Sequence, residues 1–94
     1  MSRELSAQDA ARVIESAFAP LRCVAEPWDY EYRIRFRVFD ADNELLISMD
    51  EVLRPVFEDS ERLESLLKYA RERVEAKGVK LDPWSLSGPP ESAT

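Results

Sequence analysis

The side chains of this chain that could bind a ligand include a regularly spaced row of arginines. Arg33, Arg35 and Arg37 stand at every second position of a largely apolar run, 30–39. Successive side chains of a β-strand point to opposite faces of a sheet, so these three guanidinium groups should share one face. With Arg22 and Arg54 they predict a basic strip that could hold an anion or the phosphates of a nucleic acid.

The same arginines have a second interpretation, in which they pair with Glu26, Glu31 and Asp50 of the chain itself. The face would then be solvated or covered by a second copy of the protein. The 94-residue chain carries 13 Lys and Arg against 19 Asp and Glu, and its net charge of -6 repels phosphate backbones. Because the strip also lacks a set of stacking aromatic residues, we expect a binding face for which nucleic acid is the disfavoured ligand.

The chain has no histidine, the commonest general acid or base near neutral pH. Its one cysteine, Cys23, lies in an apolar alternation, so we predict a core residue rather than a nucleophile. The spacing of Glu15, Glu26 and Glu51 does not require them to meet as an acid–base pair. We therefore predict no catalytic residue and no cofactor. A single cysteine cannot form an internal disulfide, which favours a cytoplasmic location.

Two further motifs each have a simple structural interpretation. Asp40, Asp42 and Glu44 have the spacing that begins a calcium loop, but the required Gly and distant Glu are missing, so we predict a hairpin turn and no metal site. Trp84 follows a proline near the end of the chain and could anchor a partner protein. Packing against its own domain is the simpler role for both Trp84 and Trp28.

The elements that position these residues can be predicted from periodicity. We expect a central strand over 30–39, with Tyr30, Tyr32, Ile34, Phe36 and Val38 in the core. A short strand over 21–26 should precede it, with the turn at 27–29, and a third strand should follow the turn formers at 40–43. Helices are expected over 7–18, capped by Ser6, and over 60–77, capped by Asp59 or Ser60 and ended by Gly78.

The register of the second hairpin follows from keeping the apolar residues on one face. It pairs Phe36 with Met49 and Val38 with Ile47. It also places Arg35 opposite Asp50 and Glu31 opposite Arg54, and puts Val24, Phe39, Leu46 and Val52 among the arginines. Because the same register turns Glu51 inward, we expect a bulge or a strand end near Asp50.

These elements predict a single α+β domain over 6–84, in the order helix, strand, strand, strand, helix. Its two layers should be an antiparallel three-stranded sheet and two helices on one of its faces. The segment 53–57 contains Pro55 and should be a sheet edge or a connector, and the segment 80–84 should dock on the domain or on a neighbour. Positions 1–5 should be a lead-in and 85–94 a disordered tail.

This order of elements, with Phe18-Ala19-Pro20 at the first corner and the turn at 40–43, resembles a family of short bacterial proteins that is known as a domain of unknown function. The resemblance spans roughly residues 6–78 and implies no activity. The layout is also similar to that of double-stranded-RNA-binding domains. Those modules begin the last helix with lysines that meet phosphate, whereas this chain has Asp59-Ser60-Glu61-Arg62 there.

The sequence therefore favours a small, acidic, non-enzymatic protein that self-associates and binds another protein. The simplest assembly is a homodimer, formed through a shared sheet face or through a continued edge strand. One face of a three-stranded sheet would remain uncovered and would mix Arg with Val, Phe and Leu, which is a composition typical of interfaces. The alternative is a small-ligand-binding protein or an enzyme whose site forms at a dimer interface. Nucleic-acid binding through the arginine strip is the second alternative. No apolar stretch is long enough to cross a membrane.

Overall fold

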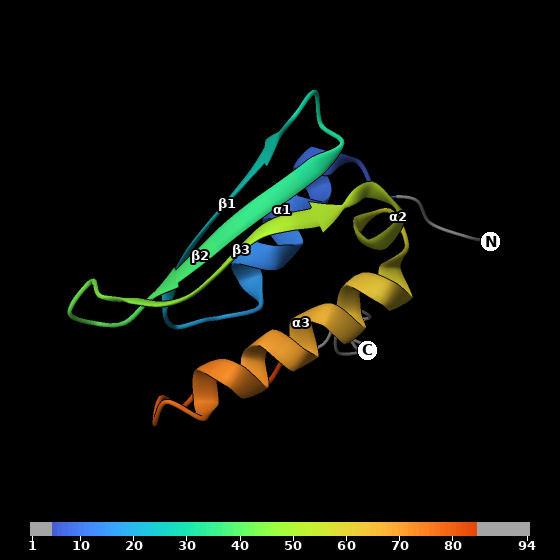
Figure 1. Ribbon diagram of the computed structural model, residues 1–94. Coiled ribbons are helices and arrows are strands. Elements are labelled where there is room, and N and C mark those ends of the chain that lie inside the picture. Colours follow the sequence, from blue (N-terminus) through green and yellow to red (C-terminus); the bar gives the residue numbers. More distant parts are fainter. Residues whose placement is uncertain (1–4, 85–94) are drawn as a thin grey trace.

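The computed structural model describes residues 5–84. Its elements are α1 (Ala7–Ser16), β1 (Arg22–Trp28), β2 (Arg33–Phe39), β3 (Leu45–Leu53), α2 (Arg54–Phe57) and α3 (Ser60–Glu75). The strands form one antiparallel sheet in the order β1-β2-β3 (Figure 1). The predicted α+β class is thereby confirmed. The predicted tail over 85–94 and most of the predicted lead-in lie outside the described residues.

Both main helices begin at the predicted caps. The Ser6 hydroxyl accepts a hydrogen bond from the Asp9 amide at 3.1 Å, and the Asp59 carboxylate accepts from the Glu61 amide at 2.9 Å. Gly78 has the left-handed φ of 92° expected where α3 gives way to the segment 80–84, which we call the exit segment. Both helices end about one turn or less before their predicted ends, because the last residues form tighter turns such as the hydrogen bond from the Ala17 amide to the Ile14 carbonyl.

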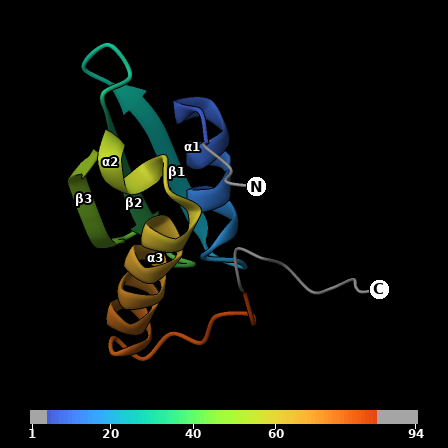
Figure 2. The ribbon, with the colours of Figure 1, turned by 90° about the vertical axis from the view of Figure 1, so that its right-hand side faces the viewer.

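The core lies between one face of the sheet and helices α1 and α3. The central strand buries Ile34, Phe36 and Val38, and the rings of Phe18 and Phe36 lie 5.7 Å apart. Figure 2 views the sheet from the side, with α1 and α3 on the same side of β3. The opposite face of the sheet has no helix over it within residues 5–84. Both helices therefore cover one face, as predicted.

The start of the central strand was predicted wrongly. Tyr30 and Tyr32 are 92% and 55% exposed rather than buried, because β2 begins only at Arg33. The strand β1 continues to Trp28, which pairs with Arg33, so the chain must reverse within 29–32. Asp29, Tyr30 and Glu31 have left-handed φ values of 57°, 55° and 69°, which no strand residue adopts.

The predicted register of the second hairpin is confirmed for Phe36 with Met49 and for Val38 with Ile47. The register shifts between Ile34 and Phe36, which places the predicted bulge at the level of Asp50. Beyond this bulge Val52 turns into the core and is only 3% exposed, so its predicted place among the arginines is wrong.

A second register shift occurs next to the hairpin turn, between Val38 and Phe39. Leu46 lies at this irregularity, is partly buried and packs against the core. Its predicted place on the open face is therefore also wrong. Each shift inserts a residue that the simple alternation does not count.

The segments at the two ends of α3 dock on the domain. The short helix α2 has its proline in the first turn and buries Phe57, as a connector would. The segment after α3 is held by Arg71 of that helix, whose guanidinium donates to the carbonyls of Ala17 at 2.6 Å and of Asp82 at 2.7 Å. The Trp84 indole donates to the Ser16 hydroxyl at 3.2 Å. Of the two surfaces predicted for 80–84, it is the domain itself that this segment contacts.

Candidate interaction face and free sheet edge

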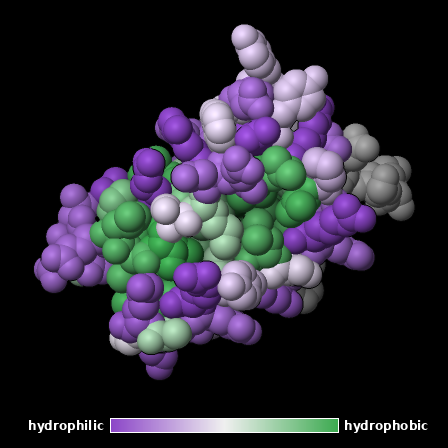
Figure 3. All heavy atoms as spheres, viewed as in Figure 1, coloured by the Kyte–Doolittle hydropathy of each residue, from purple (hydrophilic) through white to green (hydrophobic). Residues whose placement is uncertain are grey.

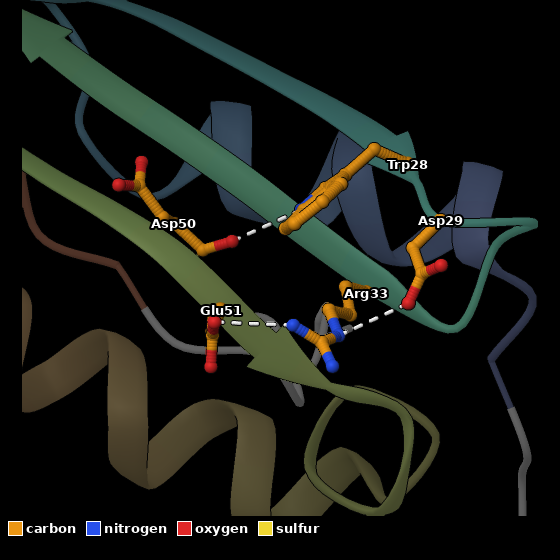
Figure 4. A network of polar contacts seen from close by, with 5 residues as sticks. All are labelled: Trp28, Asp29, Arg33, Asp50 and Glu51. Carbon is orange, nitrogen blue, oxygen red and sulfur yellow. Dashed lines mark hydrogen bonds and ion pairs between the residues drawn. The ribbon is translucent and has the colours of Figure 1, made fainter.

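The face of the sheet opposite the helices is organised by Trp28. Its Nε1 donates to the Asp50 carbonyl at 3.0 Å, so the indole crosses from β1 over β2 to β3 (Figure 4). The guanidinium carbons of Arg33 and Arg35 lie 5.4 Å and 5.8 Å from its ring. The sequence interpretation placed Trp28 in a turn and missed this role. The sequence would have placed Trp28 on a strand only if Pro27 had been taken as a residue of an edge strand rather than as the start of a turn.

Most of the predicted basic strip is neutralised by neighbouring carboxylates. Arg33 pairs with Asp29 and Glu51, each at 3.1 Å (Figure 4). Arg35 pairs with Glu26 at 2.7 Å, which is its cross-strand neighbour on β1. The predicted pairing of Arg35 with Asp50 is therefore wrong.

Arg37 lies in the same row but is exposed, and it forms no ion pair within residues 5–84. At the end of the row, Arg22 lies over the ring of Phe39, with 4.1 Å from its guanidinium carbon to the ring centroid. The open face thus presents an alternation of paired charges and apolar groups rather than a continuous positive strip.

Arg54 does not join the row, because it lies in α2 beyond the end of β3. It pairs with Glu58, whose hydrogen bond and negative charge raise the pKa of Arg54. The predicted partner Glu31 instead accepts a hydrogen bond from Gln8 at 2.8 Å, because Glu31 belongs to the turn before β2. Arg54 also lies 5.4 Å from the ring centroid of Tyr32.

Exposed apolar side chains gather along β3. Leu45 and Leu53 are 53% and 44% exposed, and Leu46 and Met49 between them are only partly buried. Figure 3 shows this apolar band as green atoms along the line of β3, with hydrophilic residues on both sides of it. The sequence interpretation placed Leu45 on the core face with Ile47 and Met49. Leu45 is instead exposed and pairs with Phe39, because the register shift at Leu46 turns it to the open face.

The two outer strands of the sheet differ in how their edges are protected. On β1 the Ala25 amide donates to the Glu15 carboxylate of α1 at 3.1 Å, and Pro27 has no amide proton to offer. The other edge strand, β3, pairs with β2 on one side and with no strand on its outer side within residues 5–84. The edge of β1 is therefore partly closed, and the edge of β3 is free.

Other groups that could do chemistry have structural roles. The Asp40 carboxylate accepts from the amides of Asp42 at 2.8 Å and Glu44 at 2.9 Å, as the predicted turn requires. Burial, together with the charge of Glu15, raises the pKa of the Cys23 thiol to about 12, so it is not a thiolate near neutral pH. Within residues 5–84 no three potential metal ligands come together.

The first turn of α3 carries negative charge where an RNA-binding module would carry positive charge. The Asp59 carboxylate accepts from the amides of both Glu61 and Arg62, so the chain's own side chain occupies these donors. No helix among the described residues has the length and apolar character needed to cross a bilayer.

The fold and its surfaces define the chain as a two-layer α+β protein with one covered and one open sheet face, and with one partly closed and one free sheet edge. Comparison with protein families, with curated proteins and with solved structures finds no match to this chain. The resemblance to a family of unknown function and to RNA-binding domains stays a prediction. The function must therefore be argued from the surfaces themselves.

Proposed function

We propose that this protein is a small, non-enzymatic association module of the cytoplasm that binds a second copy of itself and, as a dimer, a further protein. The observation that carries the proposal is the apolar band along β3. Leu45 and Leu53 are each about half exposed, although they belong to a strand that the hairpin already fixes. Apolar area left in water at a sheet edge is an association site, because pairing removes both the apolar surface and the unpaired backbone groups from water.

The charge pattern of the open face supports protein association over the alternatives. Arg33 and Arg35 are already paired with carboxylates, so their positive charge is not available to a phosphate backbone. The net charge of -6 also repels such a backbone. A small-ligand site would need convergent polar groups that are not already paired with one another. These pairs therefore favour an interface, in which Arg and Trp are enriched.

The native mass of the full, untagged chain tests the proposal. Sedimentation velocity over a range of concentrations should give twice the 10.8 kDa chain mass at the upper end. The double variant Leu45→Lys, Leu53→Lys should be monomeric, because two charges would enter the apolar band. The control Ser65→Lys, Ala76→Lys adds the same charge at two exposed positions on and after α3 and should remain dimeric. A wild-type chain that is monomeric at all concentrations would contradict the proposal.

A further inference from the structure

We infer that the second copy adds to the free edge of β3 by antiparallel pairing of the two β3 strands, with a twofold axis at Met49. The two sheets then join into one continuous sheet. This inference rests on the proposed function and specifies the surface, the partner and the register. It follows from the direction of the backbone groups, from the closed edge of β1 and from the side-chain pattern of β3.

The direction of the backbone groups on β3 can be derived from β1. The Ala25 amide donates to Glu15 of α1, so it points away from β2. In an antiparallel ladder, directly opposed residues alternate between hydrogen-bonded and non-bonded pairs. The pair Ala25–Phe36 is therefore non-bonded, the pair Phe36–Met49 is bonded, and Ser48 directs its amide and carbonyl outward from β3.

The same alternation explains why the other edge is unsuited to pairing. Pro27 lies two residues after Ala25, so its nitrogen also faces outward, where the missing proton costs the ladder nothing. A strand that approached β1 would meet the Glu15 carboxylate at one outward position and a proline at the next. At β3, the outward backbone groups of Ser48 have no strand partner within residues 5–84. A second strand therefore has one edge to join.

The side chains of β3 are complementary to themselves in one register. Pairing about Met49 uses all nine residues of the strand and places Leu45 opposite Leu53 of the second copy, twice. Ser48 then lies opposite Asp50, so a hydroxyl rather than a carboxylate faces that charge. The Asp50 carbonyl already accepts from the Trp28 indole at 3.0 Å, so the Ser48 amide of the second copy would bond to its second lone pair. Glu51 is already paired with Arg33 at 3.1 Å, which lowers the charge near the axis.

The neighbouring registers are less favourable. Pairing about Ser48 would place Leu45 against Glu51 and Leu46 against Asp50, which opposes two leucines to carboxylates. Pairing about Met49 opposes one apolar residue, Ile47, to a carboxylate, that of Glu51, which Arg33 already neutralises. Pairing about Ile47 would place Glu44 opposite Asp50, and like charges directly opposed are destabilising. A strand of another protein would need apolar residues at the positions opposite Leu45 and Leu53, whereas a second copy of β3 already has them. These comparisons select the second copy and the Met49 axis.

A disulfide experiment tests the edge and its register. In the background Cys23→Ala, Met49→Cys would be opposite itself in a non-bonded pair, where Cα atoms lie about 4.5 Å apart, within the range that a disulfide spans. We expect this variant to form a covalent dimer under mild oxidation. The control Arg37→Cys lies on the open face and should stay monomeric on a non-reducing gel. Covalent dimer from Arg37→Cys and none from Met49→Cys would overturn the edge interface.

A backbone experiment tests the same edge without oxidation. Ser48→Pro removes the outward amide proton, and Ser48→Ala removes only the hydroxyl. Since the Ser48 amide points away from β2, both variants should keep the circular dichroism of the monomer fold. Ser48→Pro should lose the dimer in sedimentation, and Ser48→Ala should retain it. A dimeric, folded Ser48→Pro protein would contradict edge pairing.

Amide exchange of the wild-type chain adds a measurement that needs no variant. The Ser48 amide should exchange slowly in concentrated protein and faster on dilution, because only the dimer pairs it. If Ser48→Pro fails to fold, this measurement and the disulfide pair decide the inference. A wild-type dimer that lacks both signals leaves the proposed association intact and rejects the edge, whereas a wild-type monomer rejects the proposed function itself.

Discussion

The protonation of the Cys23 thiol is determined by the helix α1 that packs over it. The thiol is on the covered face of β1, near the carboxylate of Glu15 on α1. Burial disfavours the thiolate, and the negative charge of Glu15 disfavours it further, so the pKa rises from 9.0 to about 12. The raised pKa and the packing of Cys23 against the core favour the predicted packing role of this thiol over that of a nucleophile.

Cys23 makes the stability of the fold sensitive to alkaline pH. Between pH 9 and 12 the folded thiol keeps its proton and the unfolded thiol loses it, so the free energy of unfolding falls as pH rises. We expect the wild-type chain to lose stability relative to Cys23→Ala when urea unfolding is measured at pH 8 and again at pH 10. Equal pH dependence of the two proteins would contradict the raised pKa. Thiol labelling at pH 8 should be slow in the native state and fast in urea.

At the residue scale, the sequence predicted which face of the central strand is buried better than it predicted where that strand begins. Alternation correctly placed Ile34, Phe36 and Val38 in the core, but it also included Tyr30 and Tyr32, which are exposed. Periodicity identifies the face of a strand, whereas the residue at which a strand begins depends on how its partner pairs. Here β1 runs on through Pro27, and no local signal in 29–32 shows the left-handed turn that this requires.

At the scale of elements, Arg71 holds three separate parts of the chain together. From α3 it donates to the carbonyl of Ala17, which follows α1, and to the carbonyl of Asp82 in the exit segment. The amide of Asp82 in turn donates to the Ala19 carbonyl at 2.9 Å. The exit segment is thus fixed to the end of α1 both by this backbone hydrogen bond and by the Arg71 guanidinium group, which offers its donors in a planar fork.

We predict that Arg71→Met destabilises the fold by about 2 kcal/mol, because two charge-assisted hydrogen bonds are lost, one to the partly buried carbonyl of Ala17 and one to the exposed carbonyl of Asp82. Amide exchange at Asp82 should accelerate strongly, because the exit segment would come away from α1. The control Arg73→Met removes an exposed arginine from the same helix and should leave both the unfolding midpoint and this exchange rate nearly unchanged. Protection at Asp82 that survives in Arg71→Met would show that Leu81 and Trp84 hold the segment without the arginine.

The elements whose ends carry local signals were the most predictable. The caps at Ser6 and Asp59, the stop at Gly78 and the bulge near Asp50 were all visible in the sequence. The protection of the β1 edge was not, because Glu15 and Ala25 lie on different elements and meet only through tertiary packing. The candidate interface was predictable only as a choice between the open face and a continued edge strand, since the exposure of β3 depends on what the helices leave uncovered.

At the scale of the whole molecule, the net charge of -6 and the paired arginines predict weak binding to polyanions. The wild-type chain should pass through a heparin column at about 0.15 M salt, where charges beyond about 8 Å are screened. At low salt, Arg37→Glu should elute with Arg12→Glu, an exposed control on α1 with the same change of charge. Retention of the wild type that is lost in Arg37→Glu alone would favour an anion site on the sheet.

The carboxylate of Glu15 has a consequence for how many copies can assemble. A sheet with two free edges can accept a strand at each end, so its association has no natural stopping point and leads toward fibres. In the inferred dimer each copy uses its free β3 edge, and the outer strands that remain are two copies of β1, each closed by Glu15 and Pro27. Assembly then stops at two chains. In that proposed dimer, the contact that fastens α1 to its neighbouring strand would also limit the assembly to two chains.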